Sequence, residues 1–146
     1  MYRNRGFTLI ELLITVAIAV IIMGVAYPSY LDQVRGSRRA ECSGGLAGLS
    51  NAMERHFTVS GSYLGAAEGG ADIGTPAVFV TNCPIDGGDP TYNLSITAAT
   101  VSTFSIQAEP IGPQTNDSCG TMTLTNTGQK GVIDADPGYD WERCWK

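Results

Sequence analysis

The apolar run near the amino terminus is the feature that most constrains what this chain can fold into. From Phe7 to Ala26 it reads FTLIELLITVAIAVIIMGVA, and Glu11 is its only charged residue. As a helix, twenty residues span about 30 Å, which is the thickness of the hydrocarbon core of a bilayer. The sequence therefore predicts a helix that is embedded in lipid or packed among other apolar helices.

A secretory signal peptide is the ordinary alternative, because the basic leader MYRNRG precedes the run and Gly-Val-Ala at 24–26 offers a small-residue cleavage site. The run, however, exceeds the usual apolar core of about 7–15 residues and carries a carboxylate. An ionised carboxylate in hydrocarbon costs about 2.5–3.5 kcal/mol, so Glu11 needs a partner. A cut after Gly6 would create an ammonium group on Phe7, four residues before Glu11. The partner could then be the ammonium of the same chain or that of a neighbouring helix.

The stretch RGFTLIE at 5–11, followed directly by the apolar run, resembles the leader of type IV prepilins, which pilins share with the pseudopilins of type II secretion. This resemblance implies cleavage between Gly6 and Phe7 by a prepilin peptidase and methylation of the new Phe7 amino group. It also implies that Glu11 serves assembly by setting the axial register between helices. The expected partners are the peptidase/methyltransferase, the inner membrane before assembly, and other pilin subunits in an extracellular fibre.

The helical pattern continues to about Phe57, with apolar residues such as Leu46, Leu49 and Met53 at helical spacing. Pro28 should kink this helix, and the glycines near Gly44 should weaken it. We expect a leader at 1–6, a transmembrane or protruding half at 7–27, an amphipathic half at 28–57 and a globular head at 58–146. The three arginines 35, 38 and 39 are expected to pair with Asp32 and Glu41 on a solvated face; the alternative is an acidic patch of a neighbouring subunit.

The head contains a glycine-rich stretch, 58–75, that is typical of a surface loop, and then short strand-like runs at 77–80, 92–96, 103–108 and 121–125. Alternating apolar residues in the last three runs predict a sheet with one buried face, and Asn126-Thr127-Gly128 predicts a hairpin turn. The fold class is therefore α+β, with an antiparallel sheet packed on one helix. The type IV pilin fold, with its long spine helix, is what the resemblance implies.

The four cysteines, Cys42, Cys83, Cys119 and Cys144, contain no C-x-x-C pair, which argues against zinc. In a small exported domain they predict two disulfides, for which three connectivities are possible. The carboxy-terminal pattern resembles PilE-type minor pilins, which close a D-region with one bridge. That resemblance favours Cys119–Cys144, enclosing 119–144, with Cys42–Cys83 as the second pair.

The segment between Cys119 and Cys144 carries Lys130 and Arg143 but four acids at 134, 136, 140 and 142. The net charge of the whole chain is −5. Because phosphate contact requires Lys or Arg, DNA is not expected as a partner, although a relative of this pilin group binds DNA through a basic carboxy-terminal face. A calcium site is not expected either, since the acids miss the spacing of a calcium loop.

The sequence offers no nucleophile–base set for catalysis. The single histidine, His56, sits near the expected helix end, where a cation suits the helix dipole. We therefore expect no enzyme activity and no cofactor. The expected function is that of a structural subunit, a minor pilin that supports fibre assembly, adhesion or twitching motility. The alternatives are a DNA-uptake minor pilin and a type II secretion pseudopilin.

Overall fold

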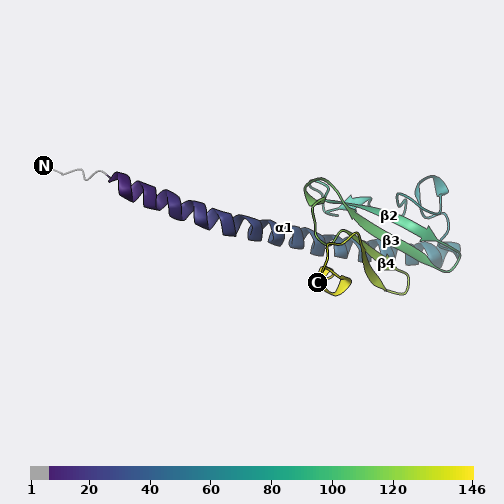
Figure 1. The fold of residues 1–146 in the computed structure, drawn as a ribbon. Coiled ribbons are helices and arrows are strands. Elements are labelled where there is room, and N and C mark those ends of the chain that lie inside the picture. The colour runs from purple at the N-terminus through teal and green to yellow at the C-terminus, as the bar shows by residue number, and fades with distance from the viewer. Residues whose placement is uncertain (1–6) are drawn as a thin grey trace. The chain divides into compact units, whose positions relative to one another are not determined.

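The computed structural model describes residues 7–146 and divides the chain into two compact units, one ending at Val34 and the other comprising Arg35–Lys146. One α-helix, α1 (Leu9–Ser60), contributes to both units (Figure 1). It continues without a break through Pro28 and through Gly44. The backbone thus keeps its helical assignment at the two places where the sequence predicts a weaker helix.

The first unit consists of the apolar half of α1, and its side chains have no core of their own to enter. Leu9, Val20 and Val25 are 78%, 64% and 73% exposed, and the other large apolar side chains between them are also exposed. By length and composition, α1 is long and apolar enough to cross a membrane. The sequence expectation of an apolar surface that needs lipid or partner helices fits this exposure.

The second unit contains one antiparallel sheet of five strands in the order β1-β2-β3-β4-β5. The strands are β1 (Asn82–Cys83), β2 (Tyr92–Ala99), β3 (Phe104–Pro110), β4 (Thr121–Thr125) and β5 (Lys130–Ile133). Short 3₁₀ helices lie at Glu68–Gly70 (η1) and Gly112–Gln114 (η2), and a four-residue helix, α2 (Trp141–Cys144), follows β5. The α+β class and the antiparallel sheet expected from the sequence are confirmed.

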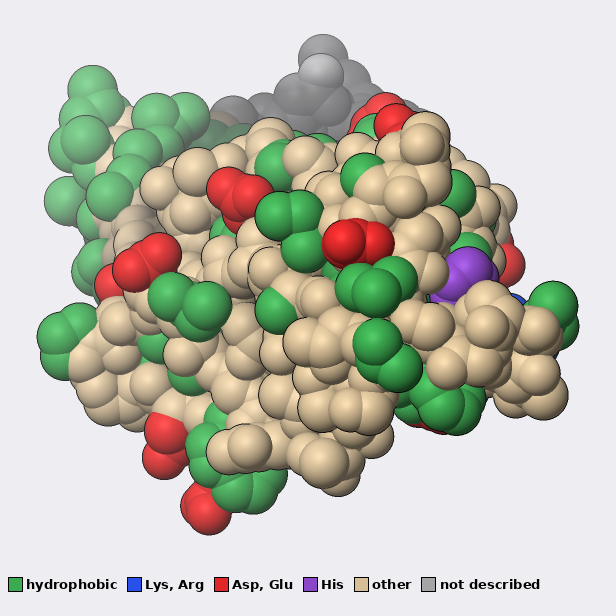
Figure 2. All heavy atoms as spheres, turned by 90° about the vertical axis from the view of Figure 1, so that its right-hand side faces the viewer, with side chains coloured by type: hydrophobic (Ala, Val, Ile, Leu, Met, Phe, Trp, Pro, Cys, Tyr) green, Lys and Arg blue, Asp and Glu red, His purple; other side chains and the backbone are tan. Residues whose placement is uncertain are grey.

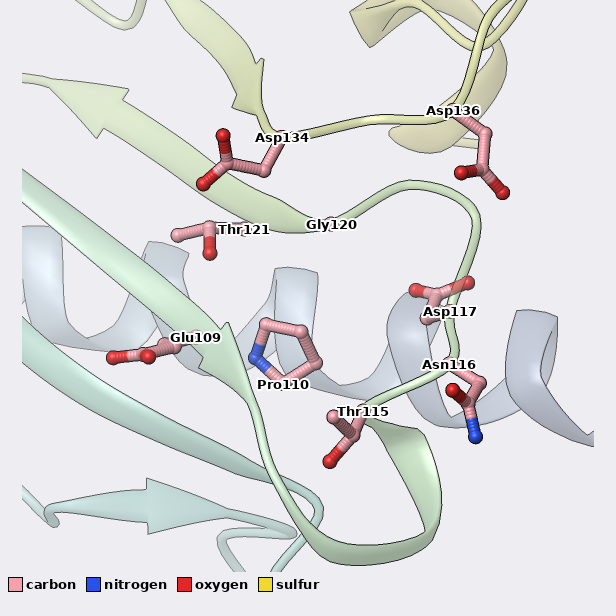
Figure 3. A pocket seen from close by; sticks show the side chains of 9 residues that line it. All are labelled: Glu109, Pro110, Thr115, Asn116, Asp117, Gly120, Thr121, Asp134 and Asp136. Carbon is pink, nitrogen blue, oxygen red and sulfur yellow. The ribbon is translucent and has the colours of Figure 1, made fainter.

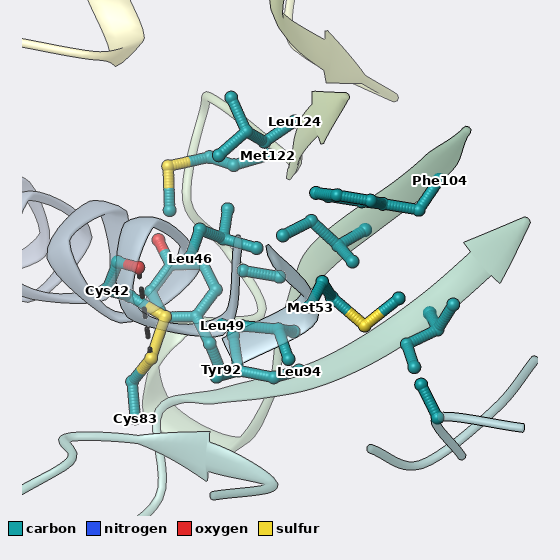
Figure 4. Packing of buried hydrophobic residues seen from close by; sticks show 14 of the residues in the cluster. Cys42, Leu46, Leu49, Met53, Cys83, Tyr92, Leu94, Phe104, Met122 and Leu124 are labelled. Atoms are coloured by element: carbon teal, nitrogen blue, oxygen red, sulfur yellow. Dashed lines mark hydrogen bonds between the residues drawn. A yellow bond between two sulfur atoms is a disulfide. The ribbon is translucent and has the colours of Figure 1, made fainter. Parts of the chain in front are cut away.

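The core of the second unit forms between one face of α1 and the inner face of the sheet (Figure 4). Leu46, Leu49 and Met53 of α1 are fully buried against alternate residues of the strands. These strand residues are Tyr92, Leu94, Ile96, Phe104, Ile106, Ala108, Met122 and Leu124. The alternation that predicted three strands therefore marks the side chains that cover the helix.

The expected strand at 77–80 is wrong: this segment consists of bends. Its apolar side chains Val78 and Phe79 pack on the core without joining the sheet. The Phe79 ring lies so close to Gly48 of α1 that a Cβ atom added to this glycine would be only 2.6 Å from the ring. The apolar character of the run therefore reflects contact with α1. Strand β5, which the sequence did not reveal, occupies the edge beyond β4.

The expected surface loop at 58–75 is only partly one, because Tyr63, Ala66 and Ala67 are buried in the core. The ring of Tyr63 stacks on Phe57 at 4.6 Å between centroids and meets Phe104 edge-on at 4.8 Å. Small and aromatic residues among the glycines thus close one end of the core.

Candidate functional site

At the amino end, Glu11 forms a capping box with Thr8 at the start of α1. The Thr8 backbone N–H donates to Glu11 Oε2 at 3.4 Å, and the Glu11 backbone N–H donates to Thr8 Oγ1 at 3.3 Å. This reciprocal arrangement is the Thr-x-x-Glu pattern of helix starts, which the sequence reading missed. Phe7 is 84% exposed beside it, and Gly6 lies outside the described residues.

The four cysteines form two disulfides, Cys42–Cys83 and Cys119–Cys144. The first joins α1 to β1, and the second joins the loop just before β4 to α2. Both are buried. The carboxy-terminal segment is therefore closed onto the sheet by a covalent bond.

The arginine cluster on α1 has a partner that the sequence did not indicate. The Arg39 guanidinium forms an ion pair with the carboxylate of Asp117, in the loop between β3 and β4. Asp117 also accepts a hydrogen bond from the Tyr92 hydroxyl at 2.7 Å. The two residues are 78 positions apart in the chain, so no local sequence pattern could have predicted their contact.

Gln114 extends this buried network by donating to the Arg35 carbonyl and to the Tyr92 hydroxyl, both at 3.0 Å. Its Oε1 has no hydrogen-bond partner within the described residues. Burial, with the neighbouring Asp117 carboxylate, raises the pKa of Tyr92 far above its ordinary value of 10. The network holds the β3–β4 loop against α1. Its role is structural, since the side chains of Tyr92, Gln114 and Asp117 are buried.

His56 has a comparable structural role. Its Nε2 lies 2.9 Å from the Leu64 carbonyl oxygen, which joins the end of α1 to the following loop. Nearby, the Tyr63 hydroxyl donates to Glu54 Oε1 at 2.9 Å. Burial and the Glu54 carboxylate raise the pKa of Tyr63.

An acidic hollow of about 420 Å³ lies beside the β3–β4 loop (Figure 3). Glu109, Asp134 and Asp136 line it together with neutral residues, and Asp117, engaged as described, forms part of its wall. Within residues 7–146, no three His, Cys, Asp or Glu side chains are grouped so as to hold a metal ion. The hollow therefore gathers two of the four acids of the carboxy-terminal segment, Asp134 and Asp136, without forming a cation centre among the described residues.

The basic side chains of the same segment lie elsewhere. Lys130, the first residue of β5, places its Nζ 5.1 Å from the centre of the Trp145 ring. The Arg143 guanidinium lies 4.1 Å over the ring of Tyr139. Lys130 and Asp134 are four residues apart along an extended strand, or about 13 Å. The structure thus separates Lys130 from Asp134, whereas Arg143 stays next to the exposed acids Asp140 and Glu142.

A second hollow of about 250 Å³ lies next to Lys130 and is lined by Gly128, Gln129, Lys130 and Trp141. We call this the turn hollow, because three of its residues belong to the β4–β5 connection and the first residue of β5. The Trp141 side chain is 48% exposed.

Figure 2, which views the end of the second unit at the right of Figure 1, shows scattered acidic side chains and hardly any basic ones. That end would repel a polyanion.

A family model described as type IV minor pilin ComP, DNA uptake sequence receptor, matches residues 28–123, more than half of the chain. The chain belongs to this family of type IV minor pilins. A second model, the prokaryotic N-terminal methylation motif, matches residues 1–27 of this pilin. The two matches confirm the resemblance drawn from residues 5–11 and the expectation that the chain is not an enzyme.

Curated relatives match this pilin over a shorter range. The type IV major pilin PilA of Myxococcus xanthus is 39% identical over 61 residues, which are 42% of this chain and 28% of that protein. The type IV major alpha-pilin of Moraxella bovis is 41% identical over 54 residues, 37% of this chain and 34% of its own length. The chain therefore spans about a third of the curated relatives that it matches.

Two solved structures are similar in outline. The non-core minor pilin PilV of Neisseria meningitidis has a TM-score of 0.48 and 18% identity, covering 75% of this chain and 99% of that one. A type IV pilin of Shewanella oneidensis has a TM-score of 0.45 and 23% identity, covering 77% and 98%. Neither likeness is close enough to transfer a site.

The family description conflicts with the expectation that DNA is not a partner of this pilin. That expectation counted charges along 119–144 as one face. In the structure Asp134 and Asp136 line the acidic hollow, whereas Lys130 lines the turn hollow. Asp140 caps α2, where its exposed carboxylate accepts from the Arg143 backbone N–H at 2.9 Å. The count along the sequence therefore combined Lys130 with two acids that line a different hollow.

Proposed function

We propose that this minor pilin binds DNA and serves DNA uptake as a subunit of a type IV pilus. The observation that carries the proposal is the family match over 28–123, which includes α1 from Pro28 and the sheet through the middle of β4. The match ends before Lys130, so the place of DNA contact has to be argued from this chain. The proposal takes the alternative left open by the sequence in preference to a purely structural subunit.

The placement of Lys130 in a different hollow from Asp134 and Asp136 supports DNA contact at the carboxy-terminal segment. Lys130 and Arg143 each lie over an aromatic ring, and the following Lys146 is exposed. Contacts of this kind, cations interleaved with aromatic rings, are typical of surfaces that bind nucleic acids. The cations are few, so binding should be weak and strongly dependent on salt.

The amino end supports placement of this subunit in a fibre. We propose cleavage between Gly6 and Phe7, methylation of Phe7, and insertion of α1 in the inner membrane before assembly. After cleavage the Phe7 ammonium adjoins the Thr8–Glu11 capping box. Glu11 then sets the register of helices by meeting that ammonium in a neighbouring subunit, because a carboxylate among apolar helices requires a cationic partner.

The test of DNA binding is a salt titration with the full chain in detergent micelles and a labelled duplex. If three cations contact phosphates, log K should fall with log salt at a slope of about −2 to −3. Lys130→Gln should reduce the magnitude of that slope by about 1. The matched control is Arg55→Gln, an exposed arginine on α1, which should leave the slope unchanged. Absence of binding at low salt would overturn the proposal.

A structural role without DNA contact remains the second candidate, and the observation that favours it is the net charge of −5. The two candidates differ in a cellular measurement. Loss of a DNA receptor should abolish uptake while leaving fibres on the cell, whereas loss of a structural subunit should reduce the fibres themselves. Normal DNA uptake in a strain that lacks the chain would decide for the second candidate.

A further inference from the structure

The turn hollow combines three kinds of groups that neither the acidic hollow nor a third hollow beside β2 brings together. Trp141 offers a half-exposed aromatic surface, Lys130 a cation and Gln129 a carboxamide. The acidic hollow by contrast is lined by carboxylates, and a third hollow, beside β2, has Glu109 as its only charged lining residue. A planar ligand that carries negative charge therefore suits the turn hollow better than either of these two hollows.

The groups around the turn hollow are held in place by the surrounding structure. The Trp145 indole N–H donates to the Gly131 carbonyl at 3.0 Å, and the Lys130 ammonium lies over the same ring. The helix that presents Trp141 is fixed at both ends, by the Asp140 cap and by the Cys119–Cys144 disulfide. An indole held in this way loses little conformational freedom when a ligand stacks on it.

We propose that the turn hollow accepts one unpaired base of DNA, stacked on the Trp141 indole, with the adjoining phosphate at Lys130 and the base edge at Gln129. The inference rests on the proposed DNA-binding function and names the form of DNA that the site prefers. A base inside a duplex has both faces covered by its neighbours, so only an unpaired or extruded base can stack on a side chain. The chain should accordingly bind single strands more tightly than a duplex of the same length.

The first experiment compares a labelled single strand with its duplex, using the full chain in detergent micelles. Trp141→Ala should weaken binding of the single strand about tenfold, and Trp141→Phe about twofold, because the ring is retained. Binding of the duplex should change less than twofold in both variants. Ile73→Ala is the matched control, since Ile73 is a similarly exposed apolar residue, 57% exposed, outside the turn hollow; it should change neither affinity.

The second experiment uses the fact that the chain has two tryptophans. In the Trp145→Phe variant, Trp141 is the only indole, and a single strand should quench its fluorescence and protect it from acrylamide. Disulfide-intact mass and an unchanged thermal transition would verify that each variant is folded. Equal loss of single-strand and duplex binding in Trp141→Ala, or unquenched Trp141 with bound DNA, would overturn the inference while DNA binding stands. Failure of the unaltered chain to bind either form would overturn both proposals.

Discussion

The two units of this pilin reach stability by opposite means. The apolar half of α1, up to Val34, satisfies its backbone within the helix but leaves its side chains exposed. The second unit buries its apolar side chains between helix and sheet and carries both disulfides. A mutation in the first unit should therefore change the assembly of subunits, whereas a mutation in the second unit should change its free energy of unfolding.

The largest effect on assembly is expected from a substitution of Glu11 in the first unit. We expect Glu11→Ala to lower incorporation into fibres at least about tenfold, since loss of the charge pair removes the interaction that sets the register. Quantitative immunoblotting of sheared fibres would measure this effect. The unfolding transition of the second unit should stay the same, and a fibre yield equal to that of the unaltered chain would rule out the register role.

The largest effect on folding is expected at Asp117. Asp117→Ala leaves the half-buried Arg39 guanidinium without this partner and the buried Tyr92 hydroxyl without its acceptor. Removing one member of a buried pair costs about 3–5 kcal/mol in the free energy of unfolding. Urea denaturation followed by circular dichroism would measure it. Asp136→Ala, at an exposed carboxylate, is the control and should change stability by less than about 0.5 kcal/mol.

Removing the Cys119–Cys144 bridge should have the next largest effect. The bridge closes a sequence separation of 25, for which chain entropy gives roughly 3 kcal/mol. The double variant Cys119→Ala/Cys144→Ala should show this loss in urea denaturation and should also expose the carboxy-terminal segment to proteases. A segment that stays protected at unchanged stability would show that packing of Trp145 alone holds it.

The smallest pair of effects concerns two glycines of α1. Gly48→Ala should destabilise by about 1–3 kcal/mol, because the new Cβ would meet the Phe79 ring at 2.6 Å. Gly44→Ala, with nothing within 4 Å of its Cβ, should stabilise by about 0.5–1 kcal/mol. Thermal melts would give opposite shifts, and shifts of the same sign would mean that helix propensity alone governs both positions.

Local patterns in the sequence were sufficient for the long helix, three of the strands and the α+β class. Each of these depends on periodic apolar residues, such as Leu94 and Ile96, whose spacing follows from backbone geometry. The contact of Phe79 with Gly48 depends on residues far apart in the chain, so the run 77–80 was mistaken for a strand. The same limit hid the pairing of Arg39 with Asp117 and the separation of Lys130 from Asp134.

The functional residues divide in the same way. The Thr8–Glu11 capping box could have been predicted from four consecutive residues. It was missed because Glu11 was interpreted only as a charge that needs a cationic partner. The turn hollow could not be predicted from the sequence, because Gln129 and Trp141 are distant in the chain and come together only in the fold. Charge counted along a sequence is informative for an extended segment and misleading for one that is folded into two faces.

The position of the Cys42–Cys83 bridge has a mechanical consequence. Cys42 lies on α1 seven residues after the second unit begins, and its partner is in the edge strand β1. Tension that reaches the head along α1 therefore meets a covalent link to the sheet near its point of entry. The helix can resist being drawn out of the second unit without relying on van der Waals contacts alone.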